Sequence, residues 1–344
     1  MNEKDFKDLY ILSFDGIGPK TLDKLNNAYN DNALSHLPGS GANASKESFQ
    51  VWREKLENDL IKKDIHILKM GDDIYPYALS KIIDAPRFLF AKGNSDILKR
   101  DLFAVVGSRK PTPYGINVSN KFAKELAQKF VLVSGMALGI DSIAHKNSLE
   151  NGTIAVLGGG LDYIYPSSNK KLHDEILANG GLILSEYFPH VVPMPGFFPQ
   201  RSRIISGLSS GLLVTEAAAK SGSLIAANLA FDQGKNVYAI PGDITRDNSS
   251  GCNYLITQNI AKLVQNVEDI LIDYGSSINL PSSIIKNLHP DSQKLVSILK
   301  LGISDIDEIL AQTEWELQKF LQIVTSLEIQ GVVSRASSDI YLNL

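Results

Sequence analysis

Aromatic and cationic side chains crowd into one short stretch of the sequence, residues 197–208. Phe197 and Phe198 precede Arg201 and Arg203, which are two positions apart. Aromatic rings stack on unpaired bases and guanidinium groups neutralise phosphates, so this combination suits single-stranded nucleic acid. In the alternative interpretation the two phenylalanines belong to the hydrophobic core.

Two short turns have the composition of anion sites. Gly107-Ser108-Arg109 lies just before a predicted helix near Pro113, and Lys220-Ser221-Gly222-Ser223 opens another helix. A helix N-terminus presents free N–H groups, and an arginine fork beside it suits a phosphate. The first turn has a plainer interpretation, a strand–helix connection with a surface arginine. Glu216 is either a catalytic carboxylate or, as we favour, a group that orders the second turn.

The usual motifs of nucleotide-driven enzymes are missing. Glycine-rich loops at residues 134–141 and 158–162 permit close backbone approach, but neither completes G-x-G-x-x-G, and no P-loop occurs. Asp141 and His145 lie one helical turn apart without a further ligand at metal spacing, so we interpret them as a hydrogen-bonded structural pair. We expect no cofactor and no metal.

The elements that position these turns form an alternating series. Apolar runs predict six strands, each followed by a turn or a helix, at Phe103–Val106, Phe130–Val133, Thr153–Leu157, Leu182–Ser185, Gly211–Thr215 and Val237–Ile240. Helical patterns separate them at Asn117–Lys129, Ile140–Glu150, Lys170–Ala178 and Ser223–Gln233. Continuous apolar strands indicate a mostly parallel sheet covered on both faces, an extended Rossmann-like, doubly wound α/β domain at residues 71–270. Ligands of such sheets collect beyond the carboxyl ends of the strands.

Two smaller domains are expected beside this core. Residues 1–68 read as a helical domain with a Gly/Ser/Asn-rich loop at Gly39–Ser45. Inside it, Gly16-Ile17-Gly18 is either a phosphate-contacting helix-hairpin-helix turn or a plain turn. Residues 271–285 read as a linker, and 286–344 as a winged helix of three helices and a hairpin. Its third helix, Glu314–Gln330, carries more acidic than basic groups, which favours contact with protein over DNA.

Composition limits the classes of protein that remain. The 344 residues are 44% hydrophobic and 21% charged with a net charge of −4, which is ordinary globular composition. Residues 100–129 nevertheless hold six basic groups against two acidic ones, so a local basic patch is expected. The chain has one cysteine, no apolar run long enough to span a membrane and no secretory pattern at its start. We therefore expect a cytoplasmic location and no membrane partner.

Together the motifs resemble the bacterial DNA-processing protein A family (DprA, also called Smf). The resemblance covers nearly the whole chain and follows the family's order. Its motifs are Tyr75-Pro76 through Lys92-Gly93, Gly107-Ser108-Arg109, Ser134-Gly135 to His145, Tyr165-Pro166-Ser167-Ser168-Asn169, Phe198-Pro199 to Arg203, Ser221-Gly222-Ser223-Leu224 and Pro241-Gly242.

The resemblance implies a core that binds single-stranded DNA, forms a homodimer and helps load a RecA-type recombinase during natural transformation. It implies no catalysis. Carried over residue by residue, the DNA-binding set is Gly107, Ser108, Arg109, Lys170, Phe198, Arg201, Arg203, Lys220, Gly222 and Ser223. The chain departs from the family at Ser202, where asparagine is usual, which removes a hydrogen bond worth about 1 kcal/mol.

Two other functions stay open on the residues. A nucleoside monophosphate phosphoribohydrolase would use Glu216 as its carboxylate and Arg109 as its phosphate ligand, but its P-G-G-x-G-T-x-x-E signature is absent. A scaffold would bind proteins through its flanking domains and leave the core inert.

Overall fold

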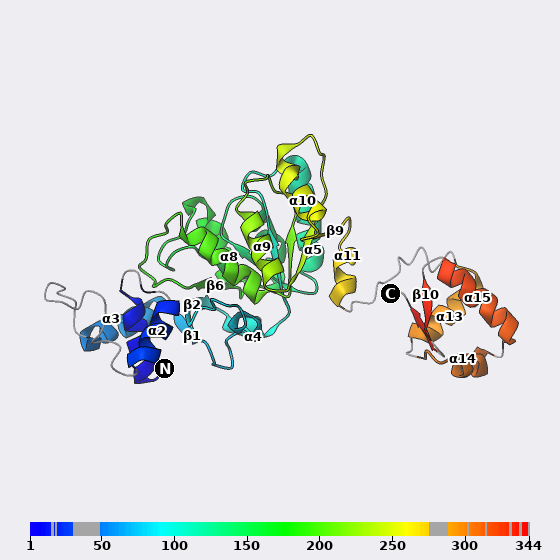
Figure 1. Cartoon of the computed structure of the whole chain (residues 1–344), viewed down its shortest axis with the longest axis horizontal. Coiled ribbons are helices and arrows are strands. Elements are labelled where there is room, and N and C mark those ends of the chain that lie inside the picture. The colour runs from blue at the N-terminus through cyan, green and yellow to red at the C-terminus, as the bar shows by residue number, and fades with distance from the viewer. Residues whose placement is uncertain are drawn as a thin grey trace. The chain divides into compact units, whose positions relative to one another are not determined.

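The computed structural model describes residues 1–14, 17, 19–29, 49–274, 288–300, 303–313, 315–329, 332–336 and 339–342. The chain divides into two compact units, Met1–Gln265 and Asn266–Leu344. Figure 1 shows the elements of both units in sequence colours. The predicted turn glycines Gly16 and Gly18, the loop at 39–45 and most of the predicted linker lie outside the described residues.

The first unit is built on a nine-stranded sheet, in the order β1-β2-β6-β5-β4-β3-β7-β8-β9 within the described residues. All neighbours from β6 to β9 pair in parallel, whereas β1–β2 and β2–β6 pair antiparallel. The strands are β1 His66–Lys69, β2 Phe88–Gly93, β3 Leu102–Val106, β4 Val131–Gly135, β5 Thr153–Val156, β6 Leu182–Ser185, β7 Gly211–Val214, β8 Asn236–Ala239 and β9 Lys262–Leu263.

Helices cover both faces of this sheet, as expected for a doubly wound fold. Alternate residues of β3 show why: Leu102, Ala104 and Val106 share a buried cluster with helices α4, α8 and α9, while Phe103 points the other way and packs on Phe130. The helices are α4 Tyr77–Ser80, α5 Pro113–Leu126, α6 Ile140–Ser148, α7 Lys170–Ala178, α8 Phe197–Leu208, α9 Ser223–Asp232 and α10 Asp247–Thr257. Short 3₁₀ turns lie at Ser95–Lys99, Leu149–Asn151 and Ser167–Asn169.

All six predicted strands are present, and the predicted fold class is confirmed. Strands β1, β2 and β9 are additions to the prediction. β1 and β9 are short strands at the two edges of the sheet, whereas β2 is a six-residue strand between β1 and β6 that the prediction missed. Strand β1 shifts the expected limit of the helical region, since residues 66–68 pair with β2 rather than belong to a helix.

Among the described residues that precede the sheet, the helices are α1 Glu3–Leu12, α2 Pro19–Tyr29 and α3 Phe49–Lys63. Leu9, Leu56 and Leu60 pack in one cluster with Phe90 of β2 and Ile176 of α7. Ion pairs add to this contact, because Arg87 holds Asp8 at 2.9 Å and Lys69 holds Asp5 at 3.2 Å. The N-terminal helices therefore cover part of one face of the sheet.

The second unit begins with α11 Glu268–Leu271 and a 3₁₀ turn at Ile272–Tyr274. Its main body has helices α13 Pro290–Lys300, α14 Ile306–Thr313 and α15 Leu317–Ile329, followed by the hairpin of β10 Val333–Ala336 and β11 Asp339–Leu342. Leu295, Ile309, Phe320, Val324 and Ile340 meet in its buried core. Three helices and a hairpin reproduce the predicted winged-helix pattern. Within the described residues, no helix has the length and apolar character needed to cross a membrane.

Candidate functional site

The loops that follow β3 and β7 converge at the carboxyl edge of the sheet. The Ser108 N–H donates to the carbonyl of Glu216 at 2.8 Å, and the Ile140 N–H donates to the carbonyl of Ser108 at 3.1 Å. These bonds join the turns after two strands to the start of α6. The open cleft above them has a volume of about 720 Å³.

Most of the predicted site residues line this cleft. Eight of the ten do so: Gly107, Ser108, Arg109, Phe198, Arg201, Lys220, Gly222 and Ser223. The turn at residues 220–223 opens α9, and this turn, including Lys220, lines the same cleft as Arg109. The structure thus brings together residues that are more than 100 positions apart in the sequence.

Arg201 is a buried cation at the wall of the cleft. Its side chain is only 7% exposed, and one terminal nitrogen donates to the Val156 carbonyl at 2.6 Å. Its Nε is buried without a hydrogen-bond partner among the described residues. Burial lowers the pKa of Arg201, while the Asp141 carboxylate opposes that shift and Arg109 adds to it. Two guanidinium groups that line the same cleft are suited to bind an anion.

Glycine makes room for Arg201. A Cβ at Gly135 would collide with the Arg201 guanidinium and with the Asp141 carboxylate. Burial also raises the pKa of Asp141, with Arg201 acting in the opposite direction. The two charges therefore share a desolvated environment that the bare backbone of Gly135 permits.

The expected hydrogen bond between Asp141 and His145 is not formed. His145 uses Nε2 with the Gly135 carbonyl at 2.7 Å and Nδ1 with the Thr153 hydroxyl at 2.8 Å, while Asp141 faces the Ala137 N–H at 3.4 Å. Burial lowers the pKa of His145 to about 4. The helical spacing put the two residues on one helix, but separate partners satisfy each of them.

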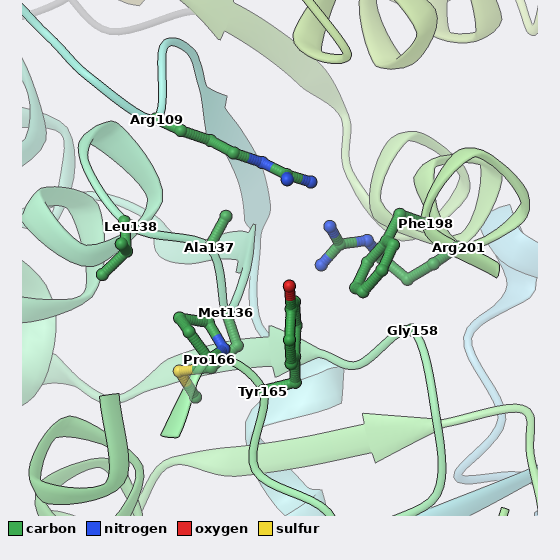
Figure 2. Close-up of a pocket in the computed structure, with 9 residues that line it drawn as sticks. All are labelled: Arg109, Met136, Ala137, Leu138, Gly158, Tyr165, Pro166, Phe198 and Arg201. Atoms are coloured by element: carbon green, nitrogen blue, oxygen red, sulfur yellow. The ribbon is translucent and has the colours of Figure 1, made fainter. Parts of the chain in front are cut away.

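Aromatic rings stand beside the two arginines. The Arg109 guanidinium carbon lies 5.6 Å from the centre of the Phe198 ring, and the Tyr165 ring lies 5.4 Å from that ring at a tilt of 38°. Figure 2 shows Arg109, Arg201 and the Tyr165 hydroxyl directed into one space from three sides. Phe198 approaches the backbone closely, since a Cβ at Gly158 would lie 2.7 Å from the ring.

Arg203 does not reach the cleft, contrary to the expectation for a shared basic pocket. Its guanidinium pairs with Glu186 at 2.6 Å and with Asp84 at 3.3 Å. Residues two positions apart on a helix point to different sides. Arg203 therefore ties α8 to the segments after α4 and β6.

Lys170 is also placed elsewhere. It stands at the start of α7 and pairs with Asp174 at 2.9 Å, beside a shallow hollow that Lys171 shares. The cleft that Arg109 and Arg201 line does not include Lys170.

The carboxylate of Glu216 serves the start of α5. Its two oxygens accept from the backbone N–H of Thr112 at 2.8 Å and from the Thr112 hydroxyl. Thr112 is also the N-cap of α5, so Glu216 orders the turn that begins α5. The sequence favours an ordering role at the turn of residues 220–223, but the carboxylate is bonded to Thr112 instead. Ser202 is likewise engaged locally, since its hydroxyl donates to the Phe198 carbonyl at 3.2 Å.

Comparison with known proteins places the chain. The model of the family described as DNA recombination-mediator protein A matches residues 66–275. The chain belongs to this family. The DNA processing protein DprA of Streptococcus pneumoniae is 48% identical over 205 residues, which are 59% of this chain and 72% of that protein. The Smf protein of Escherichia coli is 43% identical over 302 residues, covering 84% of this chain and 79% of the relative.

Solved structures of family members have the same architecture. The S. pneumoniae DprA structure has a TM-score of 0.64 at 38% identity and covers 79% of this chain and 98% of its own. DNA processing protein A from Helicobacter pylori, whose structure was described for its single-stranded DNA binding mode, has a TM-score of 0.56 at 33% identity. It covers 65% of this chain and 97% of its own.

Two residues of the motif at 165–169, Tyr165 and Asn169, also shape the cleft, although neither is among the predicted site residues. The Asn169 amide donates to the carbonyls of Met136 at 2.9 Å and Ala137 at 3.2 Å, and so holds the loop after β4. Tyr165 lines the cleft. The sequence feature that could have identified both residues is the position of the motif between a strand and the next helix, where ligands of parallel sheets collect.

Proposed function

We propose that the chain binds single-stranded DNA in this cleft, protects it and delivers it to a RecA-type recombinase during natural transformation. The observation that carries the proposal is the meeting of Arg109 and the buried Arg201 with two aromatic rings in one cleft. Phosphate would contact the arginines, and the aromatic cluster of Phe198 and Tyr165 would supply the stacking surface for a base. The H. pylori relative described for single-stranded DNA binding supports this choice of ligand.

We propose that binding here involves no catalytic step. The hydrolase alternative needs a free carboxylate near Arg109, but both oxygens of Glu216 are engaged by Thr112. A test is incubation with nucleoside monophosphates, and release of free base that is lost in Glu216→Gln would contradict the proposal.

Homodimerisation, the recombinase contact and a cytoplasmic location are further parts of the proposal. Membership of the DNA recombination-mediator family supports the recombinase as partner. In the second unit, α15 exposes Leu317 and Ile329, a surface better suited to protein than to DNA. Strand-exchange assays with a recombinase on DNA that is already coated by single-strand-binding protein test loading, and analytical ultracentrifugation tests the dimer.

The deciding experiment is fluorescence anisotropy of labelled single-stranded and duplex oligonucleotides over a salt series. We expect tight, salt-dependent binding that prefers single strands, because phosphate contacts release counterions. Arg109→Ala should weaken it and reduce the slope against log salt by about 0.7. Equal binding by both proteins would move the DNA site away from the cleft. Retained affinity after deletion of residues 281–344 would exclude the scaffold alternative.

A further inference from the structure

Tyr165 is the aromatic ring of the cleft that has most of its surface free. Its side chain is 54% exposed, whereas Phe198 is half-buried. Tyr165 lines both the large cleft and a smaller cavity beside it. The smaller cavity is mostly apolar beyond the ring, with Met136, Leu138 and Pro166 in its wall. Figure 2 shows these three residues on the side of the tyrosine that faces away from Phe198.

Phe198 has little open ring face by comparison. The backbone of Gly158 lies against it on one side, so that an added Cβ would be 2.7 Å away. The Arg109 guanidinium lies 5.6 Å from the ring centre. A base held between the two would need about 7 Å, the thickness of two van der Waals layers. A base therefore cannot enter between Arg109 and Phe198 unless one of them moves.

We propose that Tyr165 is a base-stacking residue of this site and that an unpaired nucleobase lies on its open face, over the apolar wall of Met136, Leu138 and Pro166. Phe198, 5.4 Å away, backs the tyrosine ring. The neighbouring phosphate contacts Arg109 and Arg201, toward which the Tyr165 hydroxyl points in Figure 2. This inference rests on the proposed function, because it states which part of a bound single-stranded DNA, the base, lies in the smaller cavity.

The segment that carries the ring is anchored before any ligand arrives. Asn169, four residues after Tyr165, donates to the carbonyls of Met136 and Ala137. It thereby fastens the segment that carries the tyrosine to the loop that supplies the apolar wall. A preorganised stacking surface costs less ordering entropy on binding.

The test separates base contacts from phosphate contacts. Anisotropy is measured with an oligothymidylate and with an oligonucleotide of equal length built from abasic residues, for the wild-type protein, Tyr165→Leu and Tyr165→Phe. We expect Tyr165→Leu to weaken oligothymidylate binding by about 5- to 150-fold, the range for loss of one stacked base, and to leave abasic binding unchanged. Tyr165→Phe, which keeps the ring, should bind oligothymidylate within about twofold of wild type.

Other outcomes overturn the proposal. Equal binding by wild type and Tyr165→Leu would show that the ring carries no base. Equal weakening on both oligonucleotides would show that Tyr165 acts through the phosphate contacts or the fold. No binding by the wild-type protein to either oligonucleotide would instead remove the proposed function itself.

Discussion

Arg201 and Arg203 lie two positions apart on α8, yet their guanidinium groups serve different purposes. Arg201 donates to the Val156 carbonyl and lines the cleft, while Arg203 lies away from the cleft and pairs with Glu186 and Asp84. Each keeps one buried nitrogen unpartnered among the described residues, Nε in Arg201 and Nη1 in Arg203. The helix turns about 200° between them, so only one can face the ligand. Function and stability are thus separated along one short segment.

Replacing each arginine by methionine should reveal this division. Arg201→Met should reduce affinity for single-stranded DNA at least about tenfold, because it removes a charge-assisted phosphate contact. Arg203→Met should lower the free energy of unfolding by about 2–4 kcal/mol, because Glu186 loses the partner that compensates its burial. Anisotropy and urea denaturation measure the two effects. Loss of DNA affinity in folded Arg203→Met, with no loss of stability, would contradict the assignment.

The two lysines of the predicted site should behave differently. Lys220 lies at the cleft, so Lys220→Ala should weaken DNA binding and reduce its salt dependence. Lys170 pairs with Asp174 away from the cleft, so Lys170→Ala should leave binding unchanged. The two variants remove the same charge and serve as mutual controls in one anisotropy series. An equal loss of DNA affinity in Lys220→Ala and Lys170→Ala would show that the bound DNA extends beyond this cleft to Lys170.

A side chain at Gly158 should weaken DNA binding. A Cβ there would lie 2.7 Å from the Phe198 ring, so Gly158→Ala should displace the ring and weaken binding. The matched control is Gly196→Ala, where the added methyl meets nothing within 4 Å. Circular dichroism checks the fold of both variants, and anisotropy checks their affinity. Wild-type affinity in Gly158→Ala would show that the position of Phe198 is unimportant.

His145 should make stability fall in mild acid. Its folded pKa of about 4 lies below the ordinary value of 6.5, so the unfolded chain takes up the proton first. Stability is complete above pH 6.5 and declines as the pH falls toward 4, with a loss of about 2 kcal/mol at pH 5. Urea denaturation at pH 7.5 and pH 5 measures this difference, and His145→Gln should remove that part of it. An unchanged pH dependence in the variant would assign the effect to other groups.

The sequence predicts the parallel core well because its strands are continuous apolar runs. Phe103–Val106 is expected as a strand and Leu102–Val106 is found, since burial on both faces leaves no other pattern. Loop residues such as Arg109 and Ser223 meet as expected because carboxyl ends of parallel strands share one edge. Proximity in sequence misleads at Arg203, where the rotation of α8 decides the direction, and at His145, where partners come from β4 and β5. Both outcomes depend on tertiary contacts, which the spacing of residues in the sequence does not determine.

Gly135 and Arg201 also constrain each other in evolution. The guanidinium occupies the volume that a side chain at position 135 would fill, so any larger residue there forces the arginine out. The Asp141 carboxylate reaches into the same volume. A lineage can therefore acquire a side chain at position 135 only after both the buried cation and the carboxylate have been displaced, so the three positions are expected to change together or not at all.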